Sequence, residues 1–600
     1  MVVEISVESG EVRTGAEALV MQLEAYGVDY VFGLCGHTNI AFLDALGHSS
    51  IDFVVFRHEA AAAHAADGYA RATGKPGVVC THVGPGLMNA VTGVASAAMD
   101  SVPLVAISGD VPSYYWGRHP HQEINLHADS DQAAIYRPFV KRAWTVNRVE
   151  DLSRFAERAF WTAISGRAGA VLLNVPMDVF SRPVPAHIAI PPMPEPGVGA
   201  SLDPGVAEQI AGMLVAAERP LIYIGGGVNG RHRALLADLA EHFDIPVAHS
   251  LMAKGTVPDD HPLVMGMPGF WGLEFTNEYA RAADVVLAVG TRFAETDSSS
   301  WDPRYTWRIP PTRLIQVDID PAEIGRNYPV EIGVVADAGA ALSGIAEAVR
   351  KQAPDGRTRP RLRQRIAETR SQAFGRIAAF ADDDQMPLRP ERILADLRAV
   401  LPDDAVLVTD VGWNKNGVAQ CYRLPATGRF ITPGGASTMG FGPAAALGVQ
   451  LAWTDRAVVA LIGDGGMSAQ LSAIPTAVER DLPVIFVVMN NRAHGTIADL
   501  QAAHYGRSYG CEFRNRNGEL VSPDFAELGR ACGADGYAVT HPGELQAHLN
   551  AALDARRPAV IDVPMVNEPV PTPGYWNITD IYAGGFESNQ RSADSTHQRR

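Results

Sequence analysis

Short apolar runs rich in β-branched residues alternate with longer, alanine-rich amphipathic stretches along most of this chain. One such unit reads GVVCTHVG, then LMNAVTGVASAAMD, then VPLVAISGD, between residues 77 and 110. Strands that are apolar on both faces and separated by helices are typical of parallel sheets covered by helices. We therefore predict an α/β fold, in which ligands bind beyond the carboxyl ends of the strands.

Two changes in composition divide the 600 residues into three segments of ordinary domain size. One is the proline-rich stretch RPVPAHIAIPPMPEPGVGASLDP, and the other is a basic, polar stretch after residue 350. Each segment is predicted to hold a parallel sheet flanked by helices. The predicted parts are an N-terminal domain (10–183), a linker (184–204), a central domain (205–350), a second linker (351–385), a C-terminal domain (386–570) and a tail (571–600) whose end is disordered.

Charge and cysteine usage limit the class of partner. The formal net charge is −17, and this acidic balance disfavours nucleic-acid binding, which rewards clustered Lys and Arg. Five cysteines without a CxxC pair predict neither a disulfide framework nor a thiolate metal site. Because no secretory signal or membrane-spanning run is evident, we expect a cytoplasmic protein that acts on a small molecule and has no membrane partner.

Two apolar runs end on side chains that suit magnesium. In VVALIGDGG the apolar run is followed by Gly463 and Asp464, and VIFVVMNN ends on Asn491. A right-handed crossover would place both residues at one sheet edge, and Mg²⁺ takes about six oxygen ligands, several of them from phosphates. We predict that Asp464, Asn491 and the Ala493 carbonyl hold Mg²⁺, and that Gly465 and Gly466 admit a diphosphate at a helix N-terminus. A capping Asp in an ordinary strand–turn–helix is the alternative that the GDG motif alone leaves open.

These motifs resemble those of the thiamin diphosphate (ThDP) enzymes. GDGG followed by VVMNN is similar to their cofactor motif, and RHEAAAAHAADGYARATG resembles a segment of their pyrimidine-binding domain. SGRAGAVLLNVPMDV, GGASTMGFGPAAALG and VDIDPAEIGRN most resemble acetohydroxyacid (acetolactate) synthases. The resemblance extends over nearly the whole chain. It implies pyrimidine-binding, central Rossmann-like and diphosphate-binding domains, with ThDP and Mg²⁺ as cofactors.

The same resemblance implies roles for residues at the cofactor. Glu59 is expected to face N1′ of the aminopyrimidine, in an alanine-rich pocket where desolvation raises the pKa of a carboxyl group. Met439 matches the bulky residue that bends the cofactor in relatives, and Gly412 and Gly495 are expected ThDP contacts. Contacts from both the first and third domains imply a homodimer or homotetramer with active sites at subunit interfaces.

Four polar side chains are expected beside the reacting carbon: His37, His82, Gln122 and His494. Gln122 matches a glutamine that acetohydroxyacid synthases keep near the cofactor. A histidine can relay protons near neutral pH. Since the chain has 18 histidines, a structural role for each of them is the alternative.

The central segment carries a glycine-rich turn after an apolar run, in PLIYIGGGVNG. Its dinucleotide fingerprint lacks an evident acidic partner, so a turn that binds nothing is the alternative. SLMAKGTVP, MGMPGFWG and GTRFAET nevertheless resemble flavin-contacting segments of the synthases, which implies FAD in a structural role. The expected FAD contacts are Arg167, Gly225, Gly226, Gly227, Arg292 and Asp318. Arg292 has a second interpretation, as a bidentate partner of a substrate carboxylate.

Two departures from the synthases leave the reaction open. Cys35-Gly36-His37 stands where the synthases read Pro-Gly-Gly, and Leu500 stands where they carry a Trp. The Gly-His-Thr segment resembles cyclohexane-1,2-dione hydrolase, and NNRAHGTIADLQ with CEFRNRNGEL resembles trihydroxycyclohexanedione hydrolases. We predict a ThDP-dependent carboligase or lyase that makes or breaks a carbon–carbon bond next to a carbonyl, as acetolactate synthase does with 2-oxo acids. The alternatives are hydrolytic cleavage of a cyclic 1,2-dione and a catalytically silent ThDP-fold subunit.

Overall fold

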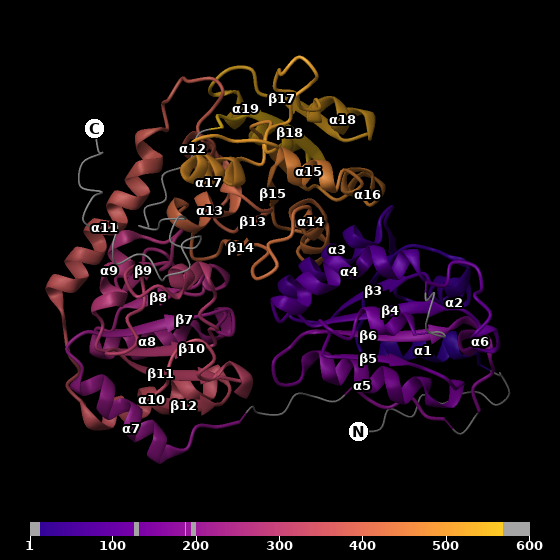
Figure 1. The fold of residues 1–600 in the computed structure, drawn as a ribbon, viewed down its shortest axis with the longest axis horizontal. Coiled ribbons are helices and arrows are strands. Elements are labelled where there is room, and N and C mark those ends of the chain that lie inside the picture. Colours follow the sequence, from indigo (N-terminus) through magenta and orange to yellow (C-terminus); the bar gives the residue numbers. More distant parts are fainter. Residues whose placement is uncertain (1–12, 125–130, 186–187, 194–199, 568–600) are drawn as a thin grey trace.

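The computed structural model describes residues 13–124, 131–185, 188–193 and 200–567, which form three lobes (Figure 1). Each lobe contains one six-stranded sheet, and the strands of each sheet pair in parallel. Helices cover the sheets, so the predicted α/β fold is confirmed. The predicted disordered tail at 571–600 lies outside the described residues.

The first lobe has the strand order β2-β1-β3-β4-β6-β5. Its strands are β1 (Tyr30–Gly33), β2 (Asp52–Val55), β3 (Gly77–Thr81), β4 (Leu104–Asp110), β5 (Arg142–Thr145) and β6 (Ala170–Pro176). Its helices are α1 (Gly15–Ala25), α2 (Ile40–Gly47), α3 (Glu59–Thr73), α4 (Pro85–Met99), α5 (Leu152–Ile164) and α6 (Met177–Ser181).

The third lobe repeats this topology, with the order β14-β13-β15-β16-β18-β17. Its strands are β13 (Val406–Thr409), β14 (Arg429–Ile431), β15 (Val458–Gly463), β16 (Ile485–Asn490), β17 (Asp535–Ala538) and β18 (Ala559–Pro564). Its helices are α12 (Pro390–Val400), α13 (Trp413–Cys421), α14 (Phe441–Ala452), α15 (Asp464–Ala469), α16 (Ala473–Glu479), α17 (Gly495–Tyr505), α18 (Phe525–Ala531) and α19 (Glu544–Ala555).

The central lobe has a different order, β12-β11-β10-β7-β8-β9. Counted along the lobe this is 3-2-1-4-5-6 read from the β9 edge, the order of doubly wound dinucleotide-binding sheets. Its strands are β7 (Pro220–Ile224), β8 (Val247–His249), β9 (Val264–Gly266), β10 (Val285–Val289), β11 (Arg313–Asp318) and β12 (Ile332–Val335). Its helices are α7 (Pro204–Ala216), α8 (Arg233–Phe243), α9 (Glu274–Ala282) and α10 (Ala338–Gln352), and α11 (Pro360–Ala379) occupies much of the predicted second linker.

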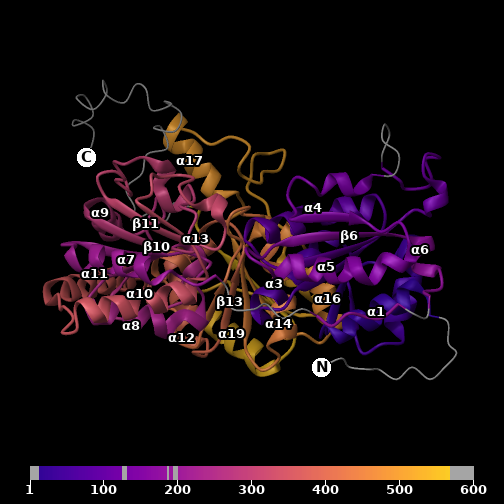
Figure 2. The ribbon, with the colours of Figure 1, turned by 90° about the horizontal axis from the view of Figure 1, so that it is seen from below.

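The first and third lobes share a hydrophobic core where α3 packs against α14 (Figures 1 and 2). Glycines allow the two helix backbones to touch: a Cβ on Gly68 would lie 2.2 Å from the Ala445 carbonyl oxygen, and one on Gly448 would lie 1.9 Å from that of Ala65. α3 begins directly after His58, whose Nδ1 accepts a hydrogen bond from Ala60 N. The packing of α3 against α14 therefore sets where the first residue of α3 lies relative to the third lobe.

No helix within the described ranges combines the length and the apolar character that crossing a membrane requires.

Candidate active site

Three oxygen-bearing groups converge at the carboxyl edge of the third sheet. β15 and β16 are neighbours, so Asp464 and Asn491, which follow them, lie side by side. One terminal atom of the Asn491 amide is 2.9 Å from the Ala493 carbonyl oxygen and 3.0 Å from Asp464 Oδ1. The amide Nδ2 donates to Asn567 Oδ1 at 3.0 Å, which turns the Asn491 oxygen toward the other two. Asp464, Asn491 and Ala493 are all buried.

This oxygen group suits a small divalent cation. Oxygens about 3 Å apart form the edges of an octahedron whose metal–oxygen bonds are about 2.1 Å long, the geometry of Mg²⁺. Asp464 Oδ2 is buried and has no hydrogen-bond partner among the described residues. With the amide reversed, the nitrogen would instead donate to both oxygens, which is the arrangement that suits the site without a cation. Burial raises the pKa of Asp464 to about 6, and a cation would lower it.

No cluster of three or more His, Cys, Asp or Glu side chains in the described part of the chain is arranged to hold a metal. The group at Asp464 differs from such a cluster because an amide and a backbone carbonyl supply two of its three oxygens. A site of this kind leaves the remaining coordination positions to a phosphate-bearing ligand or water.

The predicted glycines surround this oxygen group for different reasons. A Cβ on Gly465 would lie 2.9 Å from the His494 ring and 3.1 Å from the Met439 methyl, so these three residues lie together. Gly466 packs on Asp410, where a Cβ would lie 2.6 Å from the carboxylate. A Cβ on Gly495 would approach Asn491 Nδ2 to 2.5 Å. Gly466 and Gly495 are therefore explained by packing alone.

Gly412 opens onto two polar side chains that the sequence interpretation missed. Gly412 directly precedes α13 and has a φ of 110°. The atoms nearest to a Cβ added there would be Thr496 Oγ1 and Asn414 Nδ2. Asn414 Oδ1 is buried without a partner among the described residues. α13 and α17 both begin here, and unpaired N–H groups at helix starts favour an anion such as a diphosphate.

Glu59 lies at the corresponding edge of the first lobe. It is the first residue of α3, only 7% exposed, and its Oε2 accepts a hydrogen bond from Asn89 Nδ2 at 3.0 Å. A Cβ on Gly86 would lie 3.0 Å from Glu59 Oε1 and 3.1 Å from His82 Cβ, so the carboxylate and His82 flank the same turn.

His37 and His82 form a hydrogen-bonded pair beside Glu59. His37 Nδ1 and His82 Nε2 are 2.9 Å apart, so one ring donates and the other accepts. Gly36 makes this possible, because a Cβ there would lie 1.9 Å from the His82 ring. Burial, and then the neighbouring His37, lower the pKa of His82. His121, a histidine that the sequence interpretation did not select, has its ring 6.0 Å from that of His37.

Gln122 reaches this region through its backbone. It has a φ of 65°, and its carbonyl oxygen packs on Gly84, where a Cβ would lie 1.9 Å away. A different glutamine, Gln132, holds the same turn: its Oε1 accepts from Gly84 N at 3.0 Å and its Nε2 donates to Asn174 Oδ1 at 2.6 Å. No local signal marks Gln132, because its partners lie far away along the chain.

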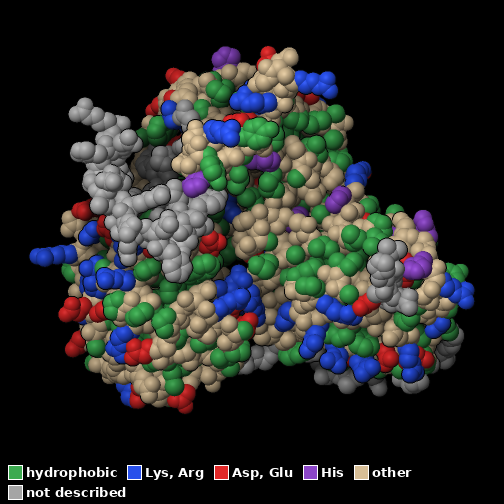
Figure 3. Space-filling view, in the orientation of Figure 1, with side chains coloured by type: hydrophobic (Ala, Val, Ile, Leu, Met, Phe, Trp, Pro, Cys, Tyr) green, Lys and Arg blue, Asp and Glu red, His purple; other side chains and the backbone are tan. Residues whose placement is uncertain are grey.

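A large cavity lies where the three lobes meet. Its volume is about 1440 Å³, above the usual range of about 300–1,000 Å³ for small-molecule pockets. Residues from all three lobes line it. All six residues predicted to contact FAD line it: Arg167, Gly225, Gly226, Gly227, Arg292 and Asp318. Figure 3 shows Lys and Arg side chains gathered where the first and central lobes face each other.

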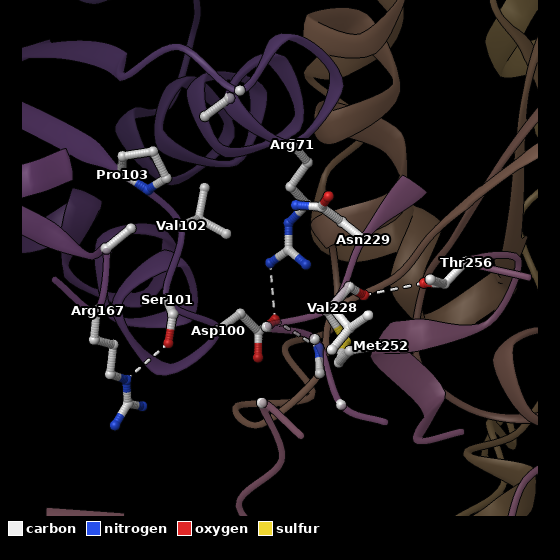
Figure 4. Close-up of a pocket in the computed structure, with 18 of the residues that line it drawn as sticks. Arg71, Asp100, Ser101, Val102, Pro103, Arg167, Val228, Asn229, Met252 and Thr256 are labelled. Carbon is white, nitrogen blue, oxygen red and sulfur yellow. Dashed lines mark hydrogen bonds and ion pairs between the residues drawn. The ribbon is translucent and has the colours of Figure 1, made fainter. Parts of the chain in front are cut away.

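The cavity wall holds two ion-paired arginines (Figure 4). Arg71 Nη2 lies 2.8 Å from Asp100 Oδ2. Arg167 Nε donates to Ser101 Oγ at 2.8 Å. The Nη1 atom of Arg167 lies 2.6 Å from Glu323 Oε1, outside the view of Figure 4. Arg167 thus links the first lobe to the central one, and its charge is largely neutralised.

The central glycine-rich turn follows β7, directly beside the end of β10, at the point where the strand order reverses. A Cβ on Gly225 would lie 2.2 Å from the Gly290 carbonyl oxygen, and one on Gly227 would lie 2.9 Å from Gly290 Cα. Close packing of the two turns therefore explains both glycines without a ligand. The ligand argument rests instead on the cavity and its position at this switch point.

All three lobes match domain models of one enzyme family. Residues 13–134 match the family described as thiamine pyrophosphate enzyme, N-terminal TPP binding domain. Residues 207–345 match the central domain of the same enzymes, and residues 410–563 match their C-terminal TPP binding domain.

Three relatives that match more than nine-tenths of this chain are acetolactate synthase subunits. A probable acetolactate synthase large subunit of Methanocaldococcus jannaschii is 34% identical, covering 92% of this chain and 91% of its own length. The acetolactate synthase large subunit of Parasynechococcus marenigrum is 36% identical, covering 92% and 87%. The acetolactate synthase isozyme 3 large subunit of Escherichia coli is 34% identical, covering 91% and 93%.

Proposed function

The chain belongs to the thiamine pyrophosphate enzymes, as an acetolactate synthase-like member, and from this we propose that it condenses two 2-oxo acids with loss of CO₂. The observation that carries the proposal is similarity over more than nine-tenths of the chain to acetolactate synthase large subunits. It is supported by the oxygen group at Asp464 and the buried carboxylate of Glu59, which occur at matching sheet edges of two lobes.

The cofactor ThDP would be held in two parts. We assign Mg²⁺ to Asp464, Asn491 and the Ala493 carbonyl, and the diphosphate to the helix starts at Gly412 and Gly495. When bound, ThDP supplies a carbon nucleophile and an electron sink. Met439, 39% exposed beside Gly465, offers the bulky side chain expected against the cofactor rings.

In this proposal the first lobe supplies most of the groups that transfer protons. Glu59 is placed to hold a proton on its carboxyl group, with Asn89 fixing the orientation of that group. The His37–His82 pair can take a proton from, or give one to, a substrate oxygen, because its two rings already share one hydrogen bond. His494, beside Gly465, is the candidate on the third lobe.

A second copy of the chain completes the site in this proposal. Within the described ranges, no hydrogen bond or ion pair joins the Glu59 group to the Asp464 group, although α3 and α14 pack together. Met88, next to Asn89 on α4, is 45% exposed, so an apolar surface borders the Glu59 group. In a twofold dimer each surface would meet the complementary lobe of the partner.

We propose FAD as the ligand of the central cavity. The cavity volume exceeds that of ordinary small-molecule pockets, and the cavity opens at the strand-order reversal where dinucleotides bind in related sheets. Carboligation requires no net redox change, so the flavin would act by holding the three lobes together.

A second candidate reaction is hydrolytic cleavage of a cyclic 1,2-dione. The His37–His82 contact favours it, because His37 stands where the synthases carry Pro-Gly-Gly and, with His82, offers two adjacent groups that can activate water or hold vicinal oxygens.

Carbon NMR of labelled pyruvate with the enzyme, ThDP, Mg²⁺ and FAD separates these reactions. Labelled acetolactate and CO₂ are the expected products. Unchanged pyruvate, with the cofactors demonstrably bound, would contradict carboligation, and ring opening of cyclohexane-1,2-dione under the same conditions would favour the second candidate.

A further inference from the structure

Lys415 is a buried cation with no carboxylate partner among the residues that the structure describes. It lies on α13 at the cavity wall and is 1% exposed. Its Nζ donates to Ser437 Oγ at 3.0 Å, and among the described residues no ion pair includes it. Taking an ammonium group out of water costs free energy unless other groups compensate its charge and hydrogen bonds. One neutral hydroxyl satisfies only one of its three donor hydrogens.

The carboxylates nearest in electrostatic effect are already engaged elsewhere. Asp100 accepts from Arg71 and from two backbone N–H groups of the loop after β14. Asp410 accepts from three backbone N–H groups around the start of α14 and after β13. These carboxylates raise the pKa of Lys415, but burial dominates and lowers it to about 8. The side chain therefore remains mostly charged at neutral pH.

The other buried lysine of the same cavity shows what a compensated charge is like. Lys254 Nζ lies 2.8 Å from Asp259 Oδ2, so its charge is paired within the protein. For Lys415 the indole of Trp271 offers only a weak substitute, with the ring centroid 5.7 Å from Nζ. Lys415 thus differs from Lys254 in lacking a counter-ion, although both line one cavity.

A second cation lies on the same side of the cavity. Arg292 has no ion pair in the described parts of the chain, and its Nη2 lies 3.6 Å from the place where a Cβ on Gly435 would stand. Gly435 and Ser437 belong to one loop, so Arg292 and Lys415 flank that loop together. The buried carboxylate of Asp297 acts electrostatically on both cations, but neither forms an ion pair with it in the described part of the chain. Lys415 and Arg292 therefore remain a complementary environment for an anionic oxygen.

We propose that Lys415 and Arg292 form an anion subsite of the central cavity, in which Lys415 donates a hydrogen bond to an anionic oxygen of the bound ligand. Two sources have this chemistry: the diphosphate of a dinucleotide and the carboxylate of a 2-oxo acid. The inference deepens the proposed function and rests on it for the identity of these ligands.

The test uses the full-length chain and three variants. Lys415→Gln removes the charge, Lys415→Arg keeps it, and Ser437→Ala removes only the hydroxyl that Lys415 contacts. The dissociation constants of FAD and ADP are measured by calorimetry, and KM and kcat for pyruvate by turnover, after circular dichroism has shown that each variant is folded.

Lys415→Gln is expected to lose at least tenfold in one of these affinities, the loss typical of a hydrogen bond to a charged group. Lys415→Arg should recover most of it, and Ser437→Ala should stay within threefold of the original chain. Weaker FAD and ADP binding together identify the diphosphate. A higher KM for pyruvate at unchanged kcat and FAD affinity identifies the carboxylate.

Changes below threefold in all three affinities of folded Lys415→Gln would overturn the subsite. Weaker FAD binding with unchanged ADP binding would also overturn it, since the contact would then be with the flavin ring. The proposed function is tested separately. If the unaltered chain binds FAD and ADP but converts no 2-oxo acid, the proposed function is wrong, and the FAD and ADP affinities of the variants still test the role of Lys415. A chain that neither binds these nucleotides nor converts pyruvate would contradict both.

Discussion

The first and third lobes have the same strand order but carry different chemistry at the same sheet edge. The residue after β3 is His82, and the residue after the equivalent strand β15 is Asp464. The helix after β2 begins with Glu59, and the helix after β14 begins at Phe441, two residues beyond Met439. Topology therefore sets where a site forms, and the residues just beyond the strands set what it can bind.

The two edges also differ in how their polar groups are satisfied. His37 and His82 bond to each other, and Glu59 bonds to Asn89, so the first-lobe group is internally paired. In the third lobe, Asp464 Oδ2 and Asn414 Oδ1 are buried without partners in the described part of the structure. Buried polar groups are normally hydrogen-bonded. Thr81 Oγ1, at the end of β3, is also buried without a partner in the described part of the structure, so the difference concerns the Glu59 and Asp464 groups themselves. In the proposed function the Asp464 group holds ligands and the Glu59 group moves protons.

The largest effect is expected from Glu59→Gln, which removes the proton-holding group of the first lobe. We expect kcat to fall about 10³-fold, within the range for general acid–base groups, while ThDP affinity stays within threefold. Steady-state kinetics and calorimetry measure the two quantities. Unchanged turnover would contradict the proposal that the first lobe supplies the proton-transfer group.

Asp464→Asn tests the opposite edge. It keeps the side-chain shape but removes the charge from the oxygen group, so Mg²⁺ affinity should fall about 100-fold, at the upper end of losses seen for groups that support a metal. Titration of ThDP binding with Mg²⁺ measures this loss, and raised Mg²⁺ should restore much of the activity. The control is the carboxylate variant Glu479→Gln at the exposed end of α16, which pairs with Arg57 and should bind Mg²⁺ normally.

His37→Asn separates proton relay from packing in the first lobe. Loss of the 2.9 Å contact with His82 should reduce kcat about tenfold and shift the acid limb of the pH–rate profile to higher pH, because His37 contributes to the lowered pKa of His82. Because burial lowers the pKa of His82, His82 should be neutral at pH 7, and activity should fall only as the pH drops below the usual titration range of histidine. An unchanged pH profile would assign the pair to packing.

The smallest effect concerns stability where the lobes meet. His64 on α3 packs against Phe441 of α14, with ring centroids 5.5 Å apart, and burial lowers its pKa from 6.5 to about 3. Between pH 6.5 and about 3, His64 is protonated in the unfolded chain but neutral in the folded chain. The free energy of unfolding therefore falls as the pH decreases, by about 1.4 kcal/mol per pH unit. Denaturant unfolding of His64→Gln between pH 6 and 4 should show a shallower loss than the original chain. Equal slopes would contradict a neutral, buried His64.

Local signals explain what the sequence could predict. Apolar runs followed by polar residues located Asp464 and Asn491, because strand ends are visible in the chain itself. Strand order was not accessible, since it depends on pairings between distant segments, and so the shared topology of the first and third lobes emerged only from the structure.

The residues that were missed lack such signals. Gln132 reaches the site through partners far away along the chain. Asn414 and Thr496 lie within two residues of the predicted Gly412 and Gly495, but nothing local shows that these two side chains face each other's turn. Gly225 and Gly227 illustrate a different limit: a glycine that admits a neighbouring turn is indistinguishable in sequence from one that admits a phosphate.

The central claim is that one active site needs the first lobe of one copy and the third lobe of another. Co-expression of Glu59→Gln and Asp464→Asn chains tests it directly, with turnover measured per chain. In a dimer with shared sites, half of the dimers are mixed and each regains one intact site, so activity should return to about one quarter of the original. If activity stays at the level of the separate variants while mixed dimers are present, each site lies within a single chain and the account is contradicted.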